Sequence, residues 1–554
     1  MRGRDVFMNS LLAHGVEHVF GNPGTTESPF LDALGDYPSI RYVTCLHEGI
    51  AVGAASYYAR QAGRCPVVNL HVAPGLGNAI GMIYNALKAQ APMVVTAGQQ
   101  DTRMLRRAPV LSHDLAAMAA PVCKWSTQVQ NADEMDQVMR RAFRIACQEP
   151  AGPVFVALPI DVMEQSTDNL AQPPGAIRVR QRPDDDALGA AASLLAQADA
   201  PAIVVGDAVG RGGAMPALVA LAERIGAPVF GEGIRGHVSF PAAHPQWRGG
   251  VAFDAAGIRA GLGDADAVLL VGGPFFEELW FAPGSPFPKG ARVIQLETSE
   301  QTLGVNHSPD VGLVGDMALS LAALDAAVDD RLGAIEREQA SLRVAELGEQ
   351  ARAAELARKA RLEKAWNRSP IPMSRVMVEL AAGTPENAIL VEETITASLE
   401  FAAAFKPSRP DAYLGARGGG IGQGLAGAPG AAVAEPGRPV LCISGDGSAM
   451  YSIQALWTAA HLRQSIVFVI LVNREYRVLK HNLDIYRQRF GLEAEASYPH
   501  MNLQEPALGF VELARGMGLS ARHITVADDI EPALHDAFSA GGPHLIAIEI
   551  EGKR

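Results

Sequence analysis

The chain has 554 residues, of which 48% are hydrophobic and 19% charged, so it can bury several cores and is too apolar to be a disordered protein. Its 47 basic and 60 acidic side chains give a formal charge of −13, and because the backbone of nucleic acid is also negative, no nucleic acid partner is expected. The five cysteines form no C-x-x-C pair, which argues against a disulfide framework and a thiolate zinc site.

Neither a membrane-spanning segment nor a secretion signal is recognisable in the sequence. Apolar runs such as 466–472 are far shorter than the ~20 residues that a membrane helix needs. Behind Arg2, Arg4 and Asp5 there is no apolar stretch of the kind found in a signal peptide. We therefore expect no membrane partner and a cytoplasmic enzyme.

The first part of the chain, 1–165, alternates short β-branched runs with helical patterns. Strands are predicted at 16–20, 40–46, 66–72 and 93–98, helices from about residue 25, over 48–62 and over 78–89, and a loop at 73–77. Strand–helix alternation at this spacing is typical of a parallel, doubly wound sheet. We assign 1–165 to an N-terminal α/β domain.

Two further α/β units are predicted after a polar segment with three prolines, 166–187, which reads as a linker. A charged, alanine-rich stretch, 329–366, predicts a helix between these two units. The central unit, 187–328, has predicted strands at 203–205, 229–230, 267–271 and 293–296, and the third unit, 367–554, has them at 389–391, 440–444, 466–472 and 545–550. The predicted fold class is therefore α/β, with three doubly wound domains built on mainly parallel sheets.

Two predicted strands of the third unit end in polar residues. Strand 440–444 runs into Gly-Asp-Gly-Ser at 445–448, and strand 466–472 ends at Asn473. Ligands bind at the carboxyl ends of parallel strands, where glycines let backbone amides approach a phosphate. Asp446 and Asn473 add hard oxygen donors of the kind that Mg²⁺ prefers. The alternative interpretation is a simple turn at Gly-Asp-Gly and a helix cap at Asn473.

The spacing Gly-Asp-Gly, 25 residues, Asn resembles the cofactor motif of the thiamine diphosphate-dependent decarboxylase and acetolactate synthase superfamily. The resemblance implies a Mg²⁺ ion held by Asp446, Asn473 and the main-chain carbonyl of Glu475. It also implies the domain names Pyr for 1–165 and PP for 367–554. The residues that it places at thiamine diphosphate are Gly419, Ile421, Gly445, Asp446, Gly447, Ser448, Asn473 and Tyr476.

The first unit contains the other half of the implied site. Leu46-His47-Glu48 ends a predicted strand and opens a helix, where this superfamily keeps its catalytic glutamate. A carboxylate facing N1′ of the aminopyrimidine stabilises the imino tautomer, so that N4′ can take the proton from C2 of the thiazolium. Without the resemblance, Glu48 would be an ordinary acidic residue in the first turn of a helix.

Several strings resemble the benzoylformate decarboxylases of this superfamily, over nearly the whole chain. They include Gly-Asn-Pro-Gly at 21–24, Asn-Leu-His at 69–71 and Tyr-Ser-Ile at 451–453. The resemblance implies that His71 is an active-site acid or base and that Thr25 replaces the active-site serine. Gly419 and Ile421 match a segment that contacts the aminopyrimidine, and the bulk of Ile421 would hold the cofactor in its V shape.

The sequence departs from the family at the implied substrate pocket. Leu279 stands where the family has a second histidine, so that either Glu277 or Glu278 substitutes for it or the alignment shifts within 273–281. The segment after Asn473 is more basic than in the family. Its implied pocket residues are Arg477, Leu479, Lys480 and His481. They form either a solvated helix face or a pocket for a more polar or doubly anionic substrate.

The implied function is a thiamine diphosphate- and Mg²⁺-dependent non-oxidative decarboxylation of a 2-oxo acid, giving an aldehyde and CO₂. The alternative is a carboligase or lyase of the same superfamily that joins or cleaves 2-hydroxy ketones, because one proton relay is missing at Leu279. FAD is not expected, since the loose glycines at 206–213 are weak evidence for a dinucleotide. The resemblance also implies a cofactor shared between two chains, hence a homo-oligomer, as a dimer of dimers.

Two other classes of protein fit the sequence less well. A dinucleotide-dependent oxidoreductase would fit the glycines at 418–422, but no acidic residue ends a strand about 20 residues further on. A binding protein that keeps the fold without catalysis is disfavoured by the retention of Glu48, Asp446 and Asn473. The 56 glycines include clusters at 21–24, 75–77, 418–420 and 445–447, which we expect where loops meet cofactor or substrate.

Overall fold

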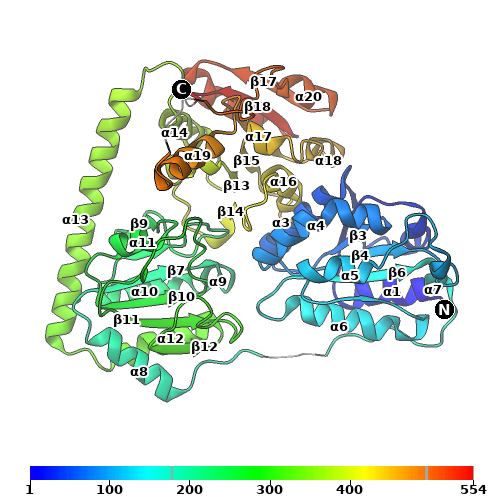
Figure 1. The fold of residues 1–554 in the computed structure, drawn as a ribbon, viewed down its shortest axis with the longest axis horizontal. Coiled ribbons are helices and arrows are strands. Elements are labelled where there is room, and N and C mark those ends of the chain that lie inside the picture. Colours follow the sequence, from blue (N-terminus) through cyan, green and yellow to red (C-terminus); the bar gives the residue numbers. More distant parts are fainter. Residues whose placement is uncertain (176–178, 493–496, 553–554) are drawn as a thin grey trace. The chain divides into compact units, whose positions relative to one another are not determined.

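The computed structural model describes residues 1–175, 179–492 and 497–552 and contains three six-stranded sheets (Figure 1). Neighbouring strands pair in parallel in each of them. The predicted α/β class with three doubly wound sheets is therefore confirmed. Residues 176–178 of the predicted linker and 553–554 of the predicted third domain lie outside the described residues.

The chain forms two compact units, which are described one at a time. The first comprises Met1–Ala176, Asn367–Phe401 and Ala416–Arg554, and the second comprises Ile177–Trp366 and Ala402–Gly415. Of the predicted linker 166–187, the described residues 166–175 and 179–184 contain no helix and no strand of a sheet, whereas residues 185–187 already belong to helix α8 (Asp185–Ala196).

The first sheet of the first unit is built from local strand–helix pairs. Its strand order is β2 (Arg41–Thr44), β1 (His18–Gly21), β3 (Val67–Leu70), β4 (Met93–Gln99), β6 (Pro153–Pro159), β5 (Ser126–Gln128). Helices α1 (Gly3–Ala13), α3 (Glu48–Ala62), α4 (Val72–Lys88) and α6 (Met135–Cys147) connect or cover these strands. The patterns missed β5, β6 and α1, of which β6 is a continuous buried run that lacks the alternation of a half-buried strand.

The loop predicted at 73–77 is wrong, because α4 begins at Val72, directly after His71. Pro74 lies in the first turn, where a missing N–H costs nothing. Gly75 donates its N–H to the carbonyl of His71 at 2.8 Å and so continues the helix. The Pro-Gly sequence that predicted a loop is thus the start of a helix.

A second sheet of parallel strands carries the candidate cofactor motif. Its strands within the first unit are, in order, β13 (Ile389–Glu393), β15 (Val440–Gly445), β16 (Ile466–Val472), β18 (His544–Glu549), β17 (Ser520–Ile524). Its helices include α14 (Met373–Gly383), α16 (Gln423–Ala434), α17 (Asp446–Ala449), α18 (Ala455–His461), α19 (Arg477–Arg489), α20 (Phe510–Gly516) and α21 (Ile530–Ala540). All seven residues of β16 are buried, as expected for a central strand covered on both faces.

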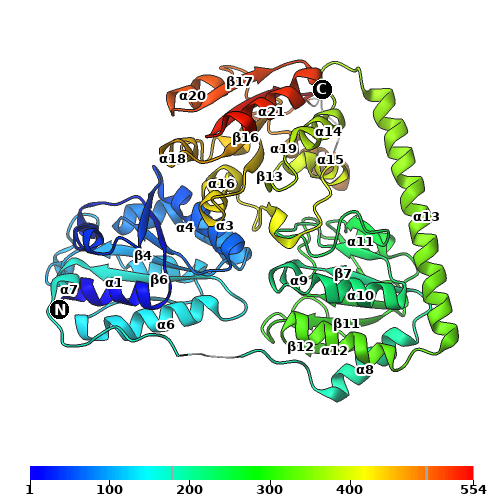
Figure 2. The same ribbon diagram turned by 180° about the vertical axis from the view of Figure 1, so that it is seen from behind.

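Helices α3 and α16 lie side by side and join the two sheets of the first unit (Figure 1, Figure 2). Small residues allow this close contact, since a Cβ at Gly53 would lie 2.6 Å from the Cβ of Ala426. A Cβ at Gly427 would overlap the ring of Tyr57. The Ala- and Gly-rich sequence of α16 is therefore explained by the packing of α3 against it.

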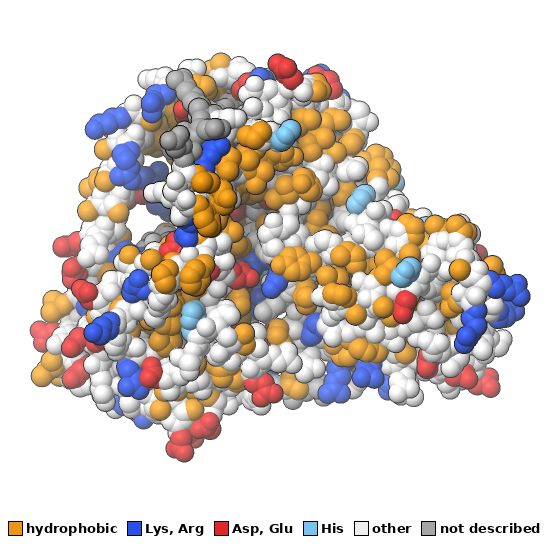
Figure 3. Space-filling model, in the orientation of Figure 1, with side chains coloured by type: hydrophobic (Ala, Val, Ile, Leu, Met, Phe, Trp, Pro, Cys, Tyr) orange, Lys and Arg blue, Asp and Glu red, His pale blue; other side chains and the backbone are white. Residues whose placement is uncertain are grey.

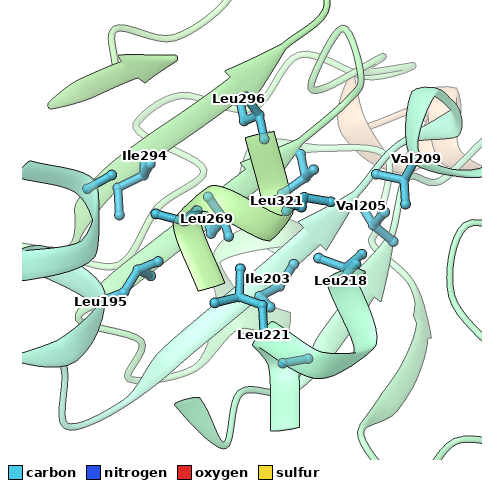
Figure 4. Close-up of a cluster of buried hydrophobic side chains, with 14 of the residues drawn as sticks. Leu195, Ile203, Val205, Val209, Leu218, Leu221, Leu269, Ile294, Leu296 and Leu321 are labelled. Carbon is cyan, nitrogen blue, oxygen red and sulfur yellow. The ribbon is translucent and has the colours of Figure 1, made fainter. Parts of the chain in front are cut away.

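The second unit has its own sheet and core. Its strand order is β12 (Val311–Val314), β11 (Arg292–Glu297), β10 (Ala267–Val271), β7 (Pro201–Val205), β8 (Val229–Gly231), β9 (Trp247–Gly250). Ile203, Leu269 and Ile294 on neighbouring strands pack against side chains of α8 (Asp185–Ala196), α10 (Met215–Ile225) and α12 (Met317–Asp329), as Figure 4 shows. The helix predicted over 329–366 is present as α13 (Ala334–Ala365), which is mostly exposed.

The surface carries charges of both signs. On the face drawn in Figure 3, Lys and Arg side chains lie among Asp and Glu side chains and do not gather into one patch. None of the helices in the described part of the chain is both long enough and apolar enough to span a bilayer.

Candidate active site

Two neighbouring strand ends of the first unit bring Asp446 and Asn473 together. Strands β15 and β16 pair in parallel, and Asp446 and Asn473 each follow the last residue of their strand. One oxygen of the Asp446 carboxylate accepts hydrogen bonds from the backbone N–H groups of Asn473, at 3.1 Å, and Arg474, at 2.6 Å. The other oxygen accepts from the N–H of Gly447 at 2.8 Å. The sequence motif thus corresponds to one hydrogen-bonded site.

The Asp446 carboxylate lies in a buried position. The residue is 2% exposed, and burial raises the pKa of its carboxyl group to about 6, against the opposing effect of the three backbone N–H groups. A bound cation would stabilise the ionised form of such a carboxylate. Binding of a cation here would therefore offset the cost of ionising this buried carboxylate.

The donor set fits Mg²⁺ that shares its coordination with a phosphate. In the residues that the structure describes, no cluster of three or more His, Cys, Asp or Glu side chains could hold a metal alone. The candidate set here is of another kind, one carboxylate, one amide oxygen and one main-chain carbonyl. These are hard oxygen donors, which suit Mg²⁺ when phosphate oxygens complete its shell.

The glycines beside this pair have different roles. A Cβ at Gly447 would lie 2.7 Å from the ring of Tyr476, so Gly447 allows the ring to pack on the backbone. A Cβ at Gly445 or Gly419 would meet no atom within 4 Å. The backbone at Gly445 therefore faces open space, as a diphosphate-binding loop requires, and Ser448 is buried in the following turn.

The glycine-rich segment 418–422 is held in place from two sides. Asn85 on α4 makes two hydrogen bonds of 3.2 Å with the backbone of Gly420. At the end of β13, Glu393 accepts the N–H groups of Gly422, at 2.7 Å, and Gly424, at 2.8 Å. Burial raises the pKa of Glu393 to about 7. Neither side chain was predicted from the sequence, although Glu393 follows the predicted strand 389–391 by two residues, as Asp446 follows 440–444.

This segment also carries the candidate aminopyrimidine contacts. Gly418, Gly419 and Gly422 have φ values of +79°, +82° and +92°, which strain any other residue. Ile421 lies between them and is partly exposed. The segment therefore presents one bulky side chain on a backbone that only glycine adopts easily.

Glu48 is the first residue of α3 and is 7% exposed. Its carboxylate accepts a hydrogen bond from the side-chain amide of Asn78 at 3.0 Å and a longer one from Asn22 at 3.4 Å. A Cβ at Gly75 would lie 3.1 Å from the same carboxylate. The Glu48 carboxylate is therefore held at the start of α3 by two side-chain amides.

His71 is oriented by a buried glutamate that sequence analysis did not assign to it. Its Nδ1 lies 2.9 Å from the Glu27 carboxylate, whose side chain is 1% exposed. Since an ionised carboxylate only accepts, Nδ1 carries the proton and Nε2 is left for other partners. A Cβ at Gly24 would overlap the His71 ring. Glu27 stands three residues after the Gly-Asn-Pro-Gly string at 21–24, but only the fold brings it to a histidine 44 positions later.

Thr25 is not the residue that contacts His71. It is exposed in a short 3-10 helix, and its carbonyl accepts from Ser28. The neighbouring Thr26 is buried, with its hydroxyl oxygen 3.5 Å from Nδ1 of His71. Thr26 therefore supplies the hydroxyl that lies next to the His71–Glu27 pair.

The predicted pocket residues fall into three environments. Lys480 is buried and forms an ion pair with Glu475, so its charge is neutralised within the chain. Arg477 donates to the carbonyl of Glu551 at 2.9 Å, whereas Leu479 and His481 are exposed on α19. Leu279 belongs to the second unit, where it is 61% exposed. Its placement in a substrate pocket stays a prediction.

Family models match three parts of the chain. The model for the thiamine pyrophosphate enzyme, N-terminal TPP binding domain, matches residues 1–122. The central domain of the same enzymes matches 188–324, and their C-terminal TPP binding domain matches 396–548.

Individual proteins resemble the chain over its full length. A benzoylformate decarboxylase from Pseudomonas aeruginosa is 34% identical over 97% of both chains. The large subunit of acetolactate synthase isozyme 2 from Escherichia coli is 27% identical over 100% of this chain and 96% of its own. The solved structure of a thiamine diphosphate-dependent 4-hydroxybenzoylformate decarboxylase from Rhodococcus jostii RHA1 has a TM-score of 0.87 and 28% identity, with both chains covered completely.

Proposed function

Since the chain belongs to the thiamine pyrophosphate enzyme family, we propose that it catalyses the non-oxidative decarboxylation of a 2-oxo acid to an aldehyde and CO₂. Thiamine diphosphate and Mg²⁺ are the proposed cofactors. The observation that carries the proposal is the buried Asp446 carboxylate, hydrogen-bonded at the end of β15 to the backbone of Asn473 at the end of β16. The relative named benzoylformate decarboxylase supports this reaction class.

The residues of the C-terminal sheet would bind the cofactor. Asp446, Asn473 and the carbonyl of Glu475 would hold Mg²⁺ against the diphosphate, while the backbone from Gly445 to Ser448 would donate N–H groups to it. Gly419 and Ile421 would contact the aminopyrimidine. When bound, thiamine diphosphate supplies an electron sink that accepts the electron pair left by departing CO₂.

The residues of the N-terminal sheet would move protons. Glu48 would share a proton with N1′ of the aminopyrimidine, because its carboxylate is buried at a helix start. His71, oriented by Glu27, would carry a proton to or from the substrate through Nε2. Thr25 would bind the substrate carboxylate, and because the cofactor would be shared between two chains, Thr25, His71 and Glu48 would all reach it from the same neighbouring chain. We therefore also propose a homo-oligomer, a dimer of dimers in the cytoplasm.

A carboligase or lyase acting on 2-hydroxy ketones is the second candidate. It is favoured by Leu279, which stands where a second histidine is expected and cannot transfer a proton. Similarity to acetolactate synthases also supports it.

One experiment separates these candidates. The purified protein is incubated with thiamine diphosphate, Mg²⁺ and a panel of 2-oxo acids that includes benzoylformate and 4-hydroxybenzoylformate, with and without an acceptor aldehyde. We expect CO₂ and free aldehyde without the acceptor. A 2-hydroxy ketone formed only with the acceptor would favour the carboligase, and no CO₂ from any acid would overturn the decarboxylase proposal.

A further inference from the structure

A buried ion pair lies next to the candidate metal-binding carbonyl. The side chains of Glu475 and Lys480 are 3% and 7% exposed, and Nζ of Lys480 contacts the Glu475 carboxylate. Lysine and glutamate are almost never fully buried unless they are paired. Lys480 is the fourth residue of α19, so the pair connects this helix to the end of β16.

An aromatic residue from beyond α19 packs near the pair. Nζ of Lys480 lies 5.5 Å from the ring centroid of Tyr498, a distance at which a ring attracts a cation. The Tyr498 hydroxyl in turn donates to Asp484 on α19, at 3.0 and 3.1 Å from its two oxygens. Lys480 is thus directed into the chain and away from solvent.

The backbone on both sides of Glu475 is also fixed. The carbonyl of Arg474 accepts from the N–H of Leu503 at 2.7 Å, and the N–H of Tyr476 donates to the carbonyl of Met501 at 2.9 Å. Arg474 has a φ of +57°, a conformation that a non-glycine residue holds only when its surroundings impose it. The N–H of Glu475 donates to the side-chain oxygen of Asn473 at 3.1 Å. The direction of the Glu475 carbonyl therefore depends on the contacts of this short segment.

We propose that Lys480 is a positioning residue, which holds the Glu475 side chain so that the main-chain carbonyl of Glu475 points at Mg²⁺. Lys480 does not bind the substrate anion, which leaves Arg477 and His481 as the basic groups of this segment for that task. The inference rests on the proposed function, because it assumes the metal. Removing one partner of a buried pair leaves an uncompensated charge, whereas removing both does not.

Paired substitutions test this role. The variants are Lys480→Met, Glu475→Gln and the double variant, with Arg489→Met as the matched control, since Arg489 is an exposed cation on the same helix. For each protein we measure the Mg²⁺ concentration needed to bind thiamine diphosphate, by quenching of tryptophan fluorescence. The thermal midpoint without cofactor and the KM for the best substrate complete the set.

We expect Lys480→Met and Glu475→Gln each to raise the required Mg²⁺ concentration about tenfold, the size of effect seen when the partners that orient metal ligands are lost. Both should also lower the thermal midpoint. The double variant should recover most of the thermal midpoint, because it leaves no buried charge unpaired, but not the Mg²⁺ requirement, because the side chain at position 475 is still not held. Arg489→Met should match the wild type. If either single variant fails to fold, Lys480→Arg serves as the test instead. It keeps the positive charge and should retain the Mg²⁺ requirement of the wild type.

Three results would count against this role. A raised KM with unchanged Mg²⁺ requirement in Lys480→Met would make Lys480 a substrate-binding cation. A double variant with the Mg²⁺ requirement of the wild type would show that an unpaired charge, and not the lost contact, impaired the single variants. A loss of Mg²⁺ binding in Lys480→Arg would also refute the role. A wild-type protein that binds no thiamine diphosphate at any Mg²⁺ concentration would instead refute the proposed function itself.

Discussion

Replacement of Glu27 by glutamine tests whether this buried carboxylate orients His71. The two carboxylate oxygens accept four hydrogen bonds, from the N–H of Gly24 at 2.9 Å, the N–H of Gly98 at 2.8 Å, the Thr26 hydroxyl at 2.8 Å and Nδ1 of His71 at 2.9 Å. Glutamine keeps the shape but turns one acceptor oxygen into an NH₂ donor. That donor must face either Gly24 and His71 or Gly98 and Thr26.

The expected cost follows from these four bonds. At least one buried backbone N–H, that of Gly24 or Gly98, loses its acceptor, which costs about 1–3 kcal/mol of folding stability. If the NH₂ group faces His71, Nδ1 must accept from it, so the ring proton moves to Nε2, which then no longer presents the lone pair that takes a proton. If it faces Gly98 and Thr26, His71 keeps an acceptor oxygen but loses the negative charge beside its ring. If about 2 kcal/mol of this loss appears in the transition state, kcat/KM falls about 30-fold, since 1.36 kcal/mol corresponds to tenfold.

The assay compares Glu27→Gln with Glu386→Gln, an exposed glutamate in the same unit. Release of CO₂ from the best 2-oxo acid gives kcat/KM, thermal unfolding gives the midpoint, and fluorescence quenching gives cofactor affinity. We expect Glu27→Gln to lose activity and some stability while it keeps cofactor affinity. Wild-type kcat/KM in Glu27→Gln would refute the idea that the carboxylate sets the state of His71.

Three further predictions follow from the same structure. Glu48→Gln should lower kcat by about 10²–10⁴-fold, as expected for loss of a positioned proton acceptor, with cofactor binding retained in a fluorescence titration; unchanged turnover would refute the role. Gly447→Ala should weaken cofactor binding and lower the thermal midpoint, because its Cβ would lie 2.7 Å from the Tyr476 ring. A cofactor affinity and a thermal midpoint equal to those of the wild type would show that the ring moves freely. Burial raises the pKa of Glu297 from 4.5 to about 7, so the folded protein binds its proton more tightly, and the resulting stability is present below pH 4.5 and lost as the pH rises through about 7. Glu297→Gln should therefore flatten the pH dependence of the free energy of unfolding between these values by an amount on the order of 3 kcal/mol, and an unchanged profile would contradict the assignment.

The sequence predicted features that depend on neighbouring residues, and missed those that depend on distant ones. Strands β15 and β16 are continuous apolar runs, so their ends, and with them Asp446 and Asn473, can be located from local pattern. The burial of Lys480 cannot be predicted in this way, because it depends on contact with Tyr498, which lies further along the chain. The basic sequence of α19 is equally typical of a helix face exposed to solvent. The start of α4 was misjudged for a different reason, since Pro and Gly after His71 are equally typical of a loop and of a first helical turn.

Several glycines have a different structural role from the one that the sequence suggested. The clusters at 21–24 and 75–77 were expected to make room for cofactor or substrate. In the structure, Gly24 makes room for the ring of His71, and Gly75 lies against the carboxylate of Glu48. Gly98 makes room for Glu27, because a Cβ at position 98 would overlap the Glu27 carboxylate. The candidate proton-transfer side chains thus lie directly against backbone, where neighbouring N–H groups and packing fix their positions before any ligand binds.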